Sequence, residues 1–298
     1  MEIKKLSFFI ELAKEKPRKK IVVAAAEDDN VLEAVFTAKK EGIIEPILIG
    51  NTEKINLIAK DLSLDLSGIE IISENNPSLA CKKSVTLIKE NKAQIIMKGM
   101  VSTADYLRAI LDKDNGLRKN DLLSHIGFFE LQTYHKVIAL TDAAQNIEPT
   151  LQEKIYILNN ALDIFHRLGI SEPKIAVLSA VETVNPKIPA TIDAAILTIM
   201  NKRKQIKGCI IDGPLAFDNA VSKEAAHHKG IQSEVAGDAD LLFVPEINSG
   251  NILYKSMTYF SSATVAAVIL GASAPVVLTS RADSEKSKLM SIALAASF

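Results

Sequence analysis

Short apolar runs alternate with amphipathic helical patterns along almost the whole chain. In the first half the apolar runs lie at residues 21–26, 46–49, 69–72 and 94–97. Strands that are apolar on both faces are typical of parallel sheets covered by helices on each side. The pattern therefore predicts a series of βαβ units. The helices expected after these strands span residues 30–41, 53–61, 77–90 and 104–112.

The middle of the chain departs from this rhythm. The apolar segments 122–130 and 137–141 are separated only by residues 131–136. That connection is too short for a helical crossover, so the two segments are predicted to form an antiparallel pair.

The alternation then resumes and continues to the C-terminus, so the chain as a whole is predicted to be an α/β protein with mostly parallel sheets and flanking helices. The later strands are expected at residues 175–178, 208–211, 241–244, 265–270 and 276–278. The later helices are expected at residues 151–168, 189–202, 222–228 and 250–260, and from residue 283 onward.

Composition narrows the class of protein. The 298 residues are 48% hydrophobic, enough to bury one or two domain cores, and 35 basic against 36 acidic side chains leave a formal charge of −1. No global field attracts nucleic acid or an anionic membrane.

The start of the chain predicts an amphipathic helix rather than a signal peptide, and the apolar stretch 265–278 is interrupted by Gly271 and Pro275. A cytoplasmic protein with neither kind of partner is expected, with Cys81 and Cys209 as reduced core thiols.

Loops at the carboxyl ends of parallel strands are where open α/β sheets bind ligands. The first polar loop contains Lys98, Gly99 and Thr103, with Arg108 one turn into the following helix. A lysine, an arginine and free backbone N–H groups suit a phosphate. An ordinary helix capped by Ser102 or Thr103 explains the same residues.

Three further loops offer polar side chains, each open to a turn or capping explanation. Asp142 and Asn146 follow one predicted strand and suggest a pocket floor, with Asn146 or Thr150 starting the next helix. Asp218 follows the Gly-Pro turn after residue 212. Asn248 or Ser249 caps a helix in which Asn251 also lies.

The last loop carries Ser280, Arg281 and Asp283 at the start of the final helix, the strongest pattern for oxyanion recognition. The chain has no nucleotide-binding glycine motif and no zinc-protease motif. The residues by themselves thus indicate an enzyme for an anionic ligand.

These loops together resemble the phosphate acetyl/butyryltransferase family, from about residue 20 to the C-terminus. The strings at residues 179–186 and 212–220 are more similar to the butyryl branch. The shared motifs are Lys98-Gly99 with Ala104-Asp105, Asp142 with Asn146 and Pro149-Thr150, Asp212-Gly213-Pro214-Leu215, Gly237-Asp238-Ala239-Asp240, Ser249-Gly250-Asn251 with Tyr254-Lys255, and Ser280-Arg281.

The resemblance implies a fold like that of the isocitrate and isopropylmalate dehydrogenases. Residues 1–130 with 271–298 would form one domain and residues 131–270 the other, with the active site in the cleft between them. It also implies a homodimer or higher homo-oligomer.

The implied reaction converts a short-chain acyl-CoA, butyryl-CoA or a branched analogue, and phosphate into acyl phosphate and coenzyme A. Transfer would be direct, in a ternary complex, without metal or bound cofactor. In short-chain fatty acid metabolism the product would feed a butyrate-type acyl kinase.

By the same resemblance, Arg281 and Arg108 contact phosphate and Ser280 acts in the transition state. Relatives place a catalytic aspartate where this chain has Ser287, so Asp283 or another loop carboxylate such as Asp218 is expected to replace it. The alternative is that positioning and thiolate stabilisation suffice without a dedicated base. His125 is expected to be a structural histidine, with a donor or acid role as the alternative.

Two other functions remain open from the sequence. One is a metal- and NAD(P)-dependent hydroxyacid dehydrogenase of the same fold, although no dehydrogenase motif is recognisable. The other is a non-catalytic acyl-CoA-binding protein, suggested by Ser287 and opposed by the intact Ser280-Arg281 pair.

Overall fold

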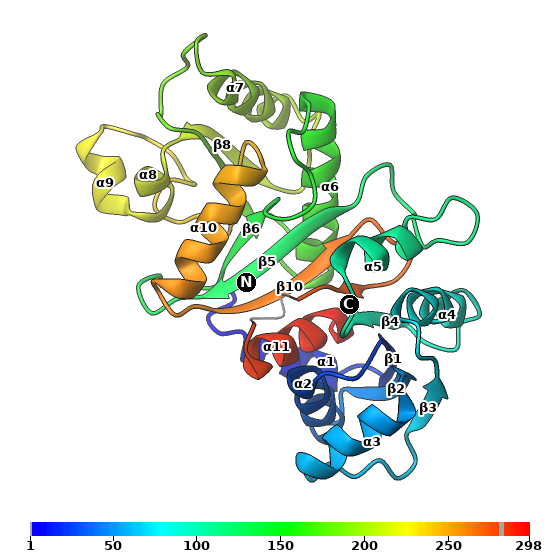
Figure 1. Ribbon diagram of the computed structural model, residues 1–298. Helices are drawn as coiled ribbons and strands as arrows, with labels where there is room; N and C mark the ends of the chain where they lie inside the picture. Colours follow the sequence, from blue (N-terminus) through cyan, green and yellow to red (C-terminus); the bar gives the residue numbers. More distant parts are fainter. Residues whose placement is uncertain (1, 280–282) are drawn as a thin grey trace. The chain divides into compact units, whose positions relative to one another are not determined.

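The computed structural model describes residues 2–279 and 283–298, and its internal contacts divide the chain into two compact units (Figure 1). Unit 1 contains Met1–Lys5 and Ser124–Thr264, and unit 2 contains Leu6–Leu123 and Val265–Phe298. Whether the units are independent domains with the predicted boundaries and an active-site cleft stays a prediction.

Unit 2 is built on strands in the order β3-β2-β1-β4-β11-β10, all parallel to their neighbours except that β10 is antiparallel to β11. The predicted βαβ series is confirmed. The strands are β1 (Lys19–Ala24), β2 (Ile44–Gly50), β3 (Glu70–Ser73), β4 (Ile95–Lys98), β10 (Thr264–Leu270) and β11 (Val276–Val277).

Polar caps start most helices of unit 2. Side chains of Asp28, Asn51, Asn76 and Ser102 accept hydrogen bonds from the first turns of α2, α3, α4 and α5. Each cap follows a strand, so the helix N-termini lie at the carboxyl end of the sheet. The helices are α1 (Ser7–Lys14), α2 (Asp29–Lys40), α3 (Thr52–Asp61), α4 (Pro77–Lys89), α5 (Thr103–Ile110) and α11 (Glu285–Ala296).

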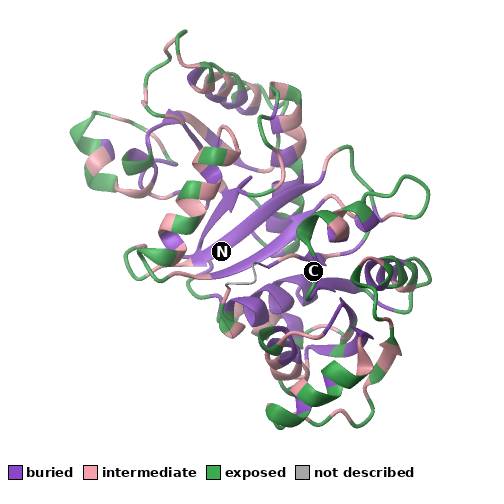
Figure 2. Cartoon of the chain, in the orientation of Figure 1, coloured by how far each residue is buried: buried purple, intermediate pink, exposed green. Residues whose placement is uncertain are grey.

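Unit 1 has strands in the order β5-β6-β9-β7-β8, and β5 runs antiparallel to β6 as predicted. The remaining neighbours are parallel. Figure 2 shows the strands buried between more exposed helices. The elements are β5 (Ser124–Glu130), β6 (Ile138–Thr141), α6 (Leu151–Arg167), β7 (Lys174–Leu178), α7 (Pro189–Lys202), β8 (Ile210–Leu215), α8 (Phe217–Val221), α9 (Lys223–His228), β9 (Leu241–Phe243) and α10 (Ile247–Tyr259).

Several boundaries differ from the sequence prediction. Strand β8 runs from Ile210 to Leu215 rather than over residues 208–211, so the Gly213-Pro214 segment predicted as a loop lies in the strand. Helix α10 begins at Ile247 rather than at residue 250, because the Glu246 carboxylate accepts from the N–H groups of Asn248 and Ser249. Neither Asn248 nor Ser249 is the cap, so that expectation was wrong. The final helix begins at Glu285, capped by Ser284 rather than starting at Asp283.

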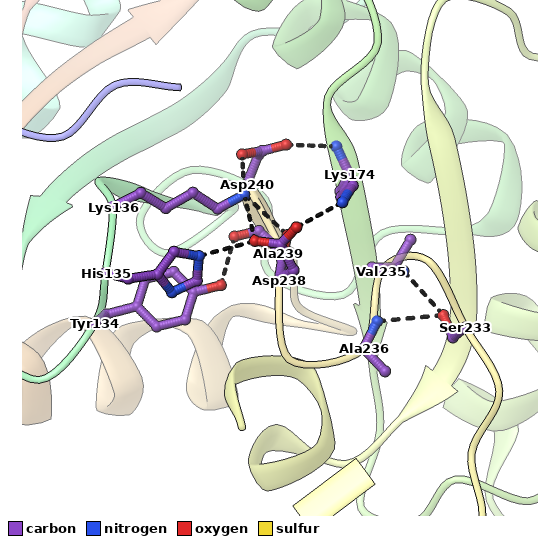
Figure 3. A network of polar contacts seen from close by, with 10 residues as sticks. All are labelled: Tyr134, His135, Lys136, Lys174, Ser233, Val235, Ala236, Asp238, Ala239 and Asp240. Atoms are coloured by element: carbon purple, nitrogen blue, oxygen red, sulfur yellow. Dashed lines mark hydrogen bonds and ion pairs between the residues drawn. The ribbon is translucent and has the colours of Figure 1, made fainter. Parts of the chain in front are cut away.

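An ion network around one buried lysine joins the amino ends of β6, β9 and β7 (Figure 3). The Lys136 ammonium, whose side chain is 2% exposed, lies 3.1 Å from an Asp238 oxygen and 2.6 Å from an Asp240 oxygen. Lys174 pairs with Asp238 at 2.5 Å, and His135 Nε2 lies 2.8 Å from the same carboxylate. The family-like segment 237–240 thus ties together the sheet end opposite the polar loops, which indicates a structural role.

Candidate active site

The carboxyl ends of β1, β2 and β4 meet closely in unit 2. A Cβ on Gly99 would overlap the carbonyl of Ala25, and one on Gly50 would overlap the Glu27 carboxylate. Glu27 Oε2 is buried, and none of the described residues supplies it with a hydrogen-bond partner. Sequence reasoning missed Glu27, although an acidic residue directly after an apolar strand was a visible signal.

Lys98 shapes the loop that follows β4. Its side chain is buried, and its ammonium donates to the carbonyls of Gly99 at 3.1 Å and Val101 at 3.2 Å. These bonds hold the chain as it turns into α5, where Ser102 Oγ accepts from the Asp105 N–H at 3.0 Å. Of the two caps considered, Ser102 is the one used.

Arg108 lies one turn into α5 with its side chain 73% exposed and paired with Asp105. The hydroxyl of Ser102 and this guanidinium lower the pKa of the Asp105 carboxyl. Arg108 also lines a cavity of about 420 Å³ between α4 and α5, together with Lys82, Thr86 and Asn115. Thr103 is exposed at the first position of α5. The guanidinium thus lies at an exposed surface, with Asp105 as its present partner.

The last candidate loop is only partly described, since Ser280 and Arg281 lie outside the described residues. The carbonyl of Asp283 accepts from the Lys288 ammonium at 2.6 Å. Ser287, at the position where relatives are expected to have an aspartate, is buried, and its Oγ accepts from the Val265 N–H at 3.3 Å. Because it binds the backbone of β10, Ser287 serves the fold.

Asp142 is the polar centre of unit 1. It is 4% exposed, and its Oδ1 accepts from the backbone N–H groups of Ala144 and Gln145, both at 2.9 Å. Its Oδ2 accepts from Asn146 Nδ2 at 2.6 Å and from the His125 N–H at 3.1 Å. The predicted neighbours Asp142 and Asn146 are therefore brought together, and the carboxylate fixes the loop after β6.

His125 lies beside this carboxylate because β5 runs antiparallel to β6. The register pairs Gly127 with Leu140, which places the start of β5 at the carboxyl end of the parallel strands. The residue is 3% exposed, and its Nδ1 has no hydrogen-bond partner in the described parts of the chain. Burial lowers the pKa of the imidazole, and the Asp142 charge opposes that shift.

Helix α10 approaches the Asp142 loop at Gly250. Asn251 Nδ2 donates to the carbonyl of Ala143 at 3.2 Å, so this predicted residue joins the cluster. Asn248 is exposed at the start of the helix and uses its N–H for the Glu246 cap. A Cβ on Gly250 would lie 2.6 Å from the carbonyl oxygen of Asp142. The small residue therefore permits the close approach.

Gly250→Ala is expected to destabilise the protein by about 1–3 kcal/mol, because the Asp142 backbone must move. The figure is the net change, after roughly 1 kcal/mol that alanine gains as a helix former is subtracted from the cost of moving the backbone. Thermal unfolding measures the change. Ser256→Ala on the same helix is the control, expected to be neutral or stabilising, and equal stability of the two variants would contradict the close approach.

A second polar cluster lies at the ends of β7 and β8. The Lys229 ammonium pairs with Asp218 at 3.2 Å and Glu182 at 3.3 Å, and Asn219 Nδ2 donates to Glu182 at 3.4 Å. Asn219 Oδ1 and Ser179 Oγ are buried and find no partner among the residues that the structure describes. Asp218 belongs to this cluster and does not cap α8, whose N-cap is Ala216.

Two negative findings apply to the described residues. None of their helices is long and apolar enough to cross a membrane. Their His, Cys, Asp and Glu side chains form no group of three that would hold a metal ion.

Comparison with known proteins identifies the family. The family model described as phosphate acetyl/butaryl transferase matches residues 6–83 and 76–296. A phosphate butyryltransferase of Clostridium acetobutylicum is 48% identical over 99% of this chain and 98% of its own length. A phosphate acetyltransferase of Thermotoga maritima is 43% identical over 98% of this chain and 99% of its own.

Solved structures agree. A branched-chain phosphotransacylase from Enterococcus faecalis superposes with a TM-score of 0.82 at 35% identity, covering 93% of this chain and 97% of that one. A 4-hydroxythreonine-4-phosphate dehydrogenase from Burkholderia phymatum reaches a TM-score of 0.52 at 13% identity, covering 95% and 98%, which is a likeness of fold alone.

Proposed function

Since this chain belongs to the phosphate acetyl/butyryl transferase family, we propose that it transfers a short-chain acyl group between coenzyme A and phosphate, with butyryl or a branched analogue preferred. The resemblance inferred from the sequence is confirmed by the family match. The observation that carries the activity is 48% identity, over nearly full length, to a phosphate butyryltransferase. The dehydrogenase and non-catalytic alternatives are not favoured.

The polar loops supply what this transfer requires. Phosphate needs cationic and N–H donors, which the α5 N-terminus and Arg108 offer, with Arg281 and Ser280 proposed for the reacting phosphoryl and carbonyl oxygens. Asp142 and Asn146 are proposed to fix the loop against which the acyl donor rests. We propose that substrate is bound or positioned by Lys98, Thr103, Asn248 and Asn251. Asp218 is also proposed to bind substrate, and Asp283 is the carboxylate of the last loop considered as a base.

We further propose direct transfer in a ternary complex, in which the acyl phosphate and the thiol are held in line. Holding both reactants in one geometry removes the entropic barrier of a bimolecular step. Donors aimed at the carbonyl oxygen stabilise the charge that develops there. Coenzyme A is then a substrate, and no step requires a metal.

The test is phosphate-dependent release of free thiol from acetyl-, butyryl-, isobutyryl- and isovaleryl-CoA. We expect the largest kcat/KM with butyryl- or a branched acyl-CoA, and since one methylene changes selectivity by roughly 10–200-fold, the acyl series resolves the preference. NAD(P) reduction with hydroxyacids is the parallel control. Absence of thiol release with every donor would refute the transferase function, whereas a preference for acetyl-CoA would refute only the acyl preference.

The remaining proposals follow from the reaction. We propose the two-domain arrangement of isocitrate and isopropylmalate dehydrogenases, which the likeness to a dehydrogenase fold supports. A homo-oligomer, a cytoplasmic location and supply of acyl phosphate to a butyrate-type kinase also remain proposals.

A further inference from the structure

The proposed reaction needs a base. Of the two carboxylates considered for it, Asp218 is paired with the Lys229 ammonium at 3.2 Å, and the charge of Asp283 interacts with the Lys288 ammonium. Both are therefore stabilised as carboxylates, which makes them weak bases. The thiol of coenzyme A must lose its proton before it can attack an acyl phosphate. Ser287 is committed to β10 and is no base. A group of another kind, placed at a carboxyl end of the sheet, is needed.

His125 has the position and surroundings of such a group. Its backbone is fixed on both sides, since its N–H donates to Asp142 Oδ2 at 3.1 Å and its carbonyl accepts from Thr141 Oγ1 at 2.7 Å. Its ring packs against Tyr254, with centroids 5.8 Å apart. The backbone bonds fix the position from which the imidazole projects, and the tyrosine ring restrains its orientation, as general acid–base catalysis requires.

Tyr254, which packs against the imidazole, is itself enclosed by neighbours on β5. Tyr254 also stacks edge-on against Phe129 at 5.1 Å, and a Cβ on Gly127 would lie only 3.3 Å from the Tyr254 ring. His125, Gly127 and Phe129 alternate along β5, so they share the face that α10 covers. Because Gly127 has no side chain, the Tyr254 ring can pack between His125 and Phe129.

The imidazole is nevertheless left without its full set of hydrogen bonds. A buried polar atom without a partner destabilises a fold by about 1–3 kcal/mol, so such atoms call for an explanation. Nδ1 of His125 is one of these atoms, and no described residue satisfies it.

We propose that His125 is the general base that takes the thiol proton of coenzyme A. As the S–H proton passes to the imidazole, the sulfur electron pair forms the C–S bond to the acyl carbon. The C–O bond to phosphate breaks with its electron pair on the departing phosphate, and the imidazolium then releases its proton. In the opposite direction the imidazolium protonates the leaving thiolate. The proposal rests on the transferase function above.

The electrostatics suit this role. Among the residues that the structure describes, the titratable groups near the ring are the Asp142 carboxylate at the end of β6 and Tyr254 on α10, whose ring packs against it. Burial lowers the pKa of His125 below its usual 6.5, so at pH 7 the imidazole is neutral and ready to accept a proton. The nearby carboxylate then stabilises the imidazolium that forms.

His125→Gln and His125→Asn test the base directly, in the full-length protein with acyl phosphate and coenzyme A. Each amide can donate a hydrogen bond near one ring nitrogen but cannot take up a proton. We expect kcat to fall by about 100-fold at pH 7 for both. In the variants only coenzyme A whose thiol is already ionised can react. The difference in kcat between variant and wild type should therefore shrink about tenfold per pH unit as the pH rises toward the thiol pKa of roughly 8.5. The exposed His228→Gln serves as the matched control with an unchanged profile.

Several outcomes would overturn the proposal. Near wild-type activity in either amide variant would mean a hydrogen-bond donor rather than a base, and an equal loss at every pH would mean a structural role. If the variants do not fold, the pH profile of the wild type tests the proposal. Its kcat/KM for coenzyme A should rise with pH up to the pKa of His125, which lies below 6.5, and stay level above it. A tenfold rise per pH unit that continues above pH 6.5 would contradict a base. A wild-type protein inactive with every acyl donor would instead refute the transferase function itself.

Discussion

Lys136→Met is expected to lower the free energy of unfolding by about 3–5 kcal/mol, the loss typical when one partner of a buried ion pair is removed. Methionine keeps most of the side-chain volume, but it leaves the carboxylates of Asp238 and Asp240 without the cation that lies between them. Thermal unfolding should show a midpoint lower by roughly 10 °C.

Lys14→Met is the matched control for this measurement. Its ammonium also pairs with a carboxylate, that of Glu41 at 2.7 Å, but its side chain is 38% exposed. Exposed pairs contribute about 0–1 kcal/mol, so the control should change little. Equal effects of the two substitutions would show that the buried network does not stabilise the protein.

Acid unfolding tests the same network through the ionisation of its carboxylates. Lys174, His135 and Lys136 outweigh the opposing effect of burial and lower the pKa of the Asp238 carboxyl well below its usual value of 3.8. A lowered pKa stabilises the fold above the unfolded value of about 3.9, and that contribution is lost as the pH falls toward the folded value. The Lys136→Met protein should therefore lose less additional stability than the wild type between pH 4 and pH 2.

Arg281→Ala is expected to lower kcat/KM by about 100- to 1000-fold, the loss typical when a donor to a developing oxyanion is removed. The expectation rests on the proposed contact between this guanidinium and the reacting phosphoryl group. Rates of thiol release at varied phosphate concentration measure the effect. A wild-type phosphate dependence in the variant would remove Arg281 from the reaction.

Arg167→Ala provides the comparison for Arg281. Its guanidinium pairs with Asp163 one turn earlier in α6 at 2.9 Å and is about half exposed. Both substitutions remove one positive charge from the protein. A loss of activity confined to Arg281→Ala would therefore reflect its place in the site rather than net charge.

Much of the fold was predictable because the local pattern and the tertiary structure agree. Runs such as residues 21–26 are apolar throughout, and only a strand covered on both faces buries them completely. The short 131–136 connection excluded a crossover and correctly gave an antiparallel pair. The small helix α8 was missed because its five residues carry no side-chain cap and no amphipathic repeat.

Site residues were predictable where a strand end and a helix start follow each other in the sequence. Asp142 and Asn146 are four positions apart, and the structure joins them directly. Glu27 was not singled out: its place after an apolar strand was visible in the sequence, but its burial depends on Gly50, which belongs to a different strand. Likewise, nothing local marks Asn219 as buried with an oxygen that no described residue hydrogen-bonds.

The sequence by itself determined the α/β class, the order of the elements and the family, because each is written in hydrophobic periodicity or in contiguous motifs. Only the tertiary structure decided the environment of single side chains. It placed His125 beside Asp142, made Ser287 a partner of β10, and showed Lys136 to be a buried cation. These outcomes depend on which strands become neighbours and how closely they pack, which no short stretch of sequence specifies.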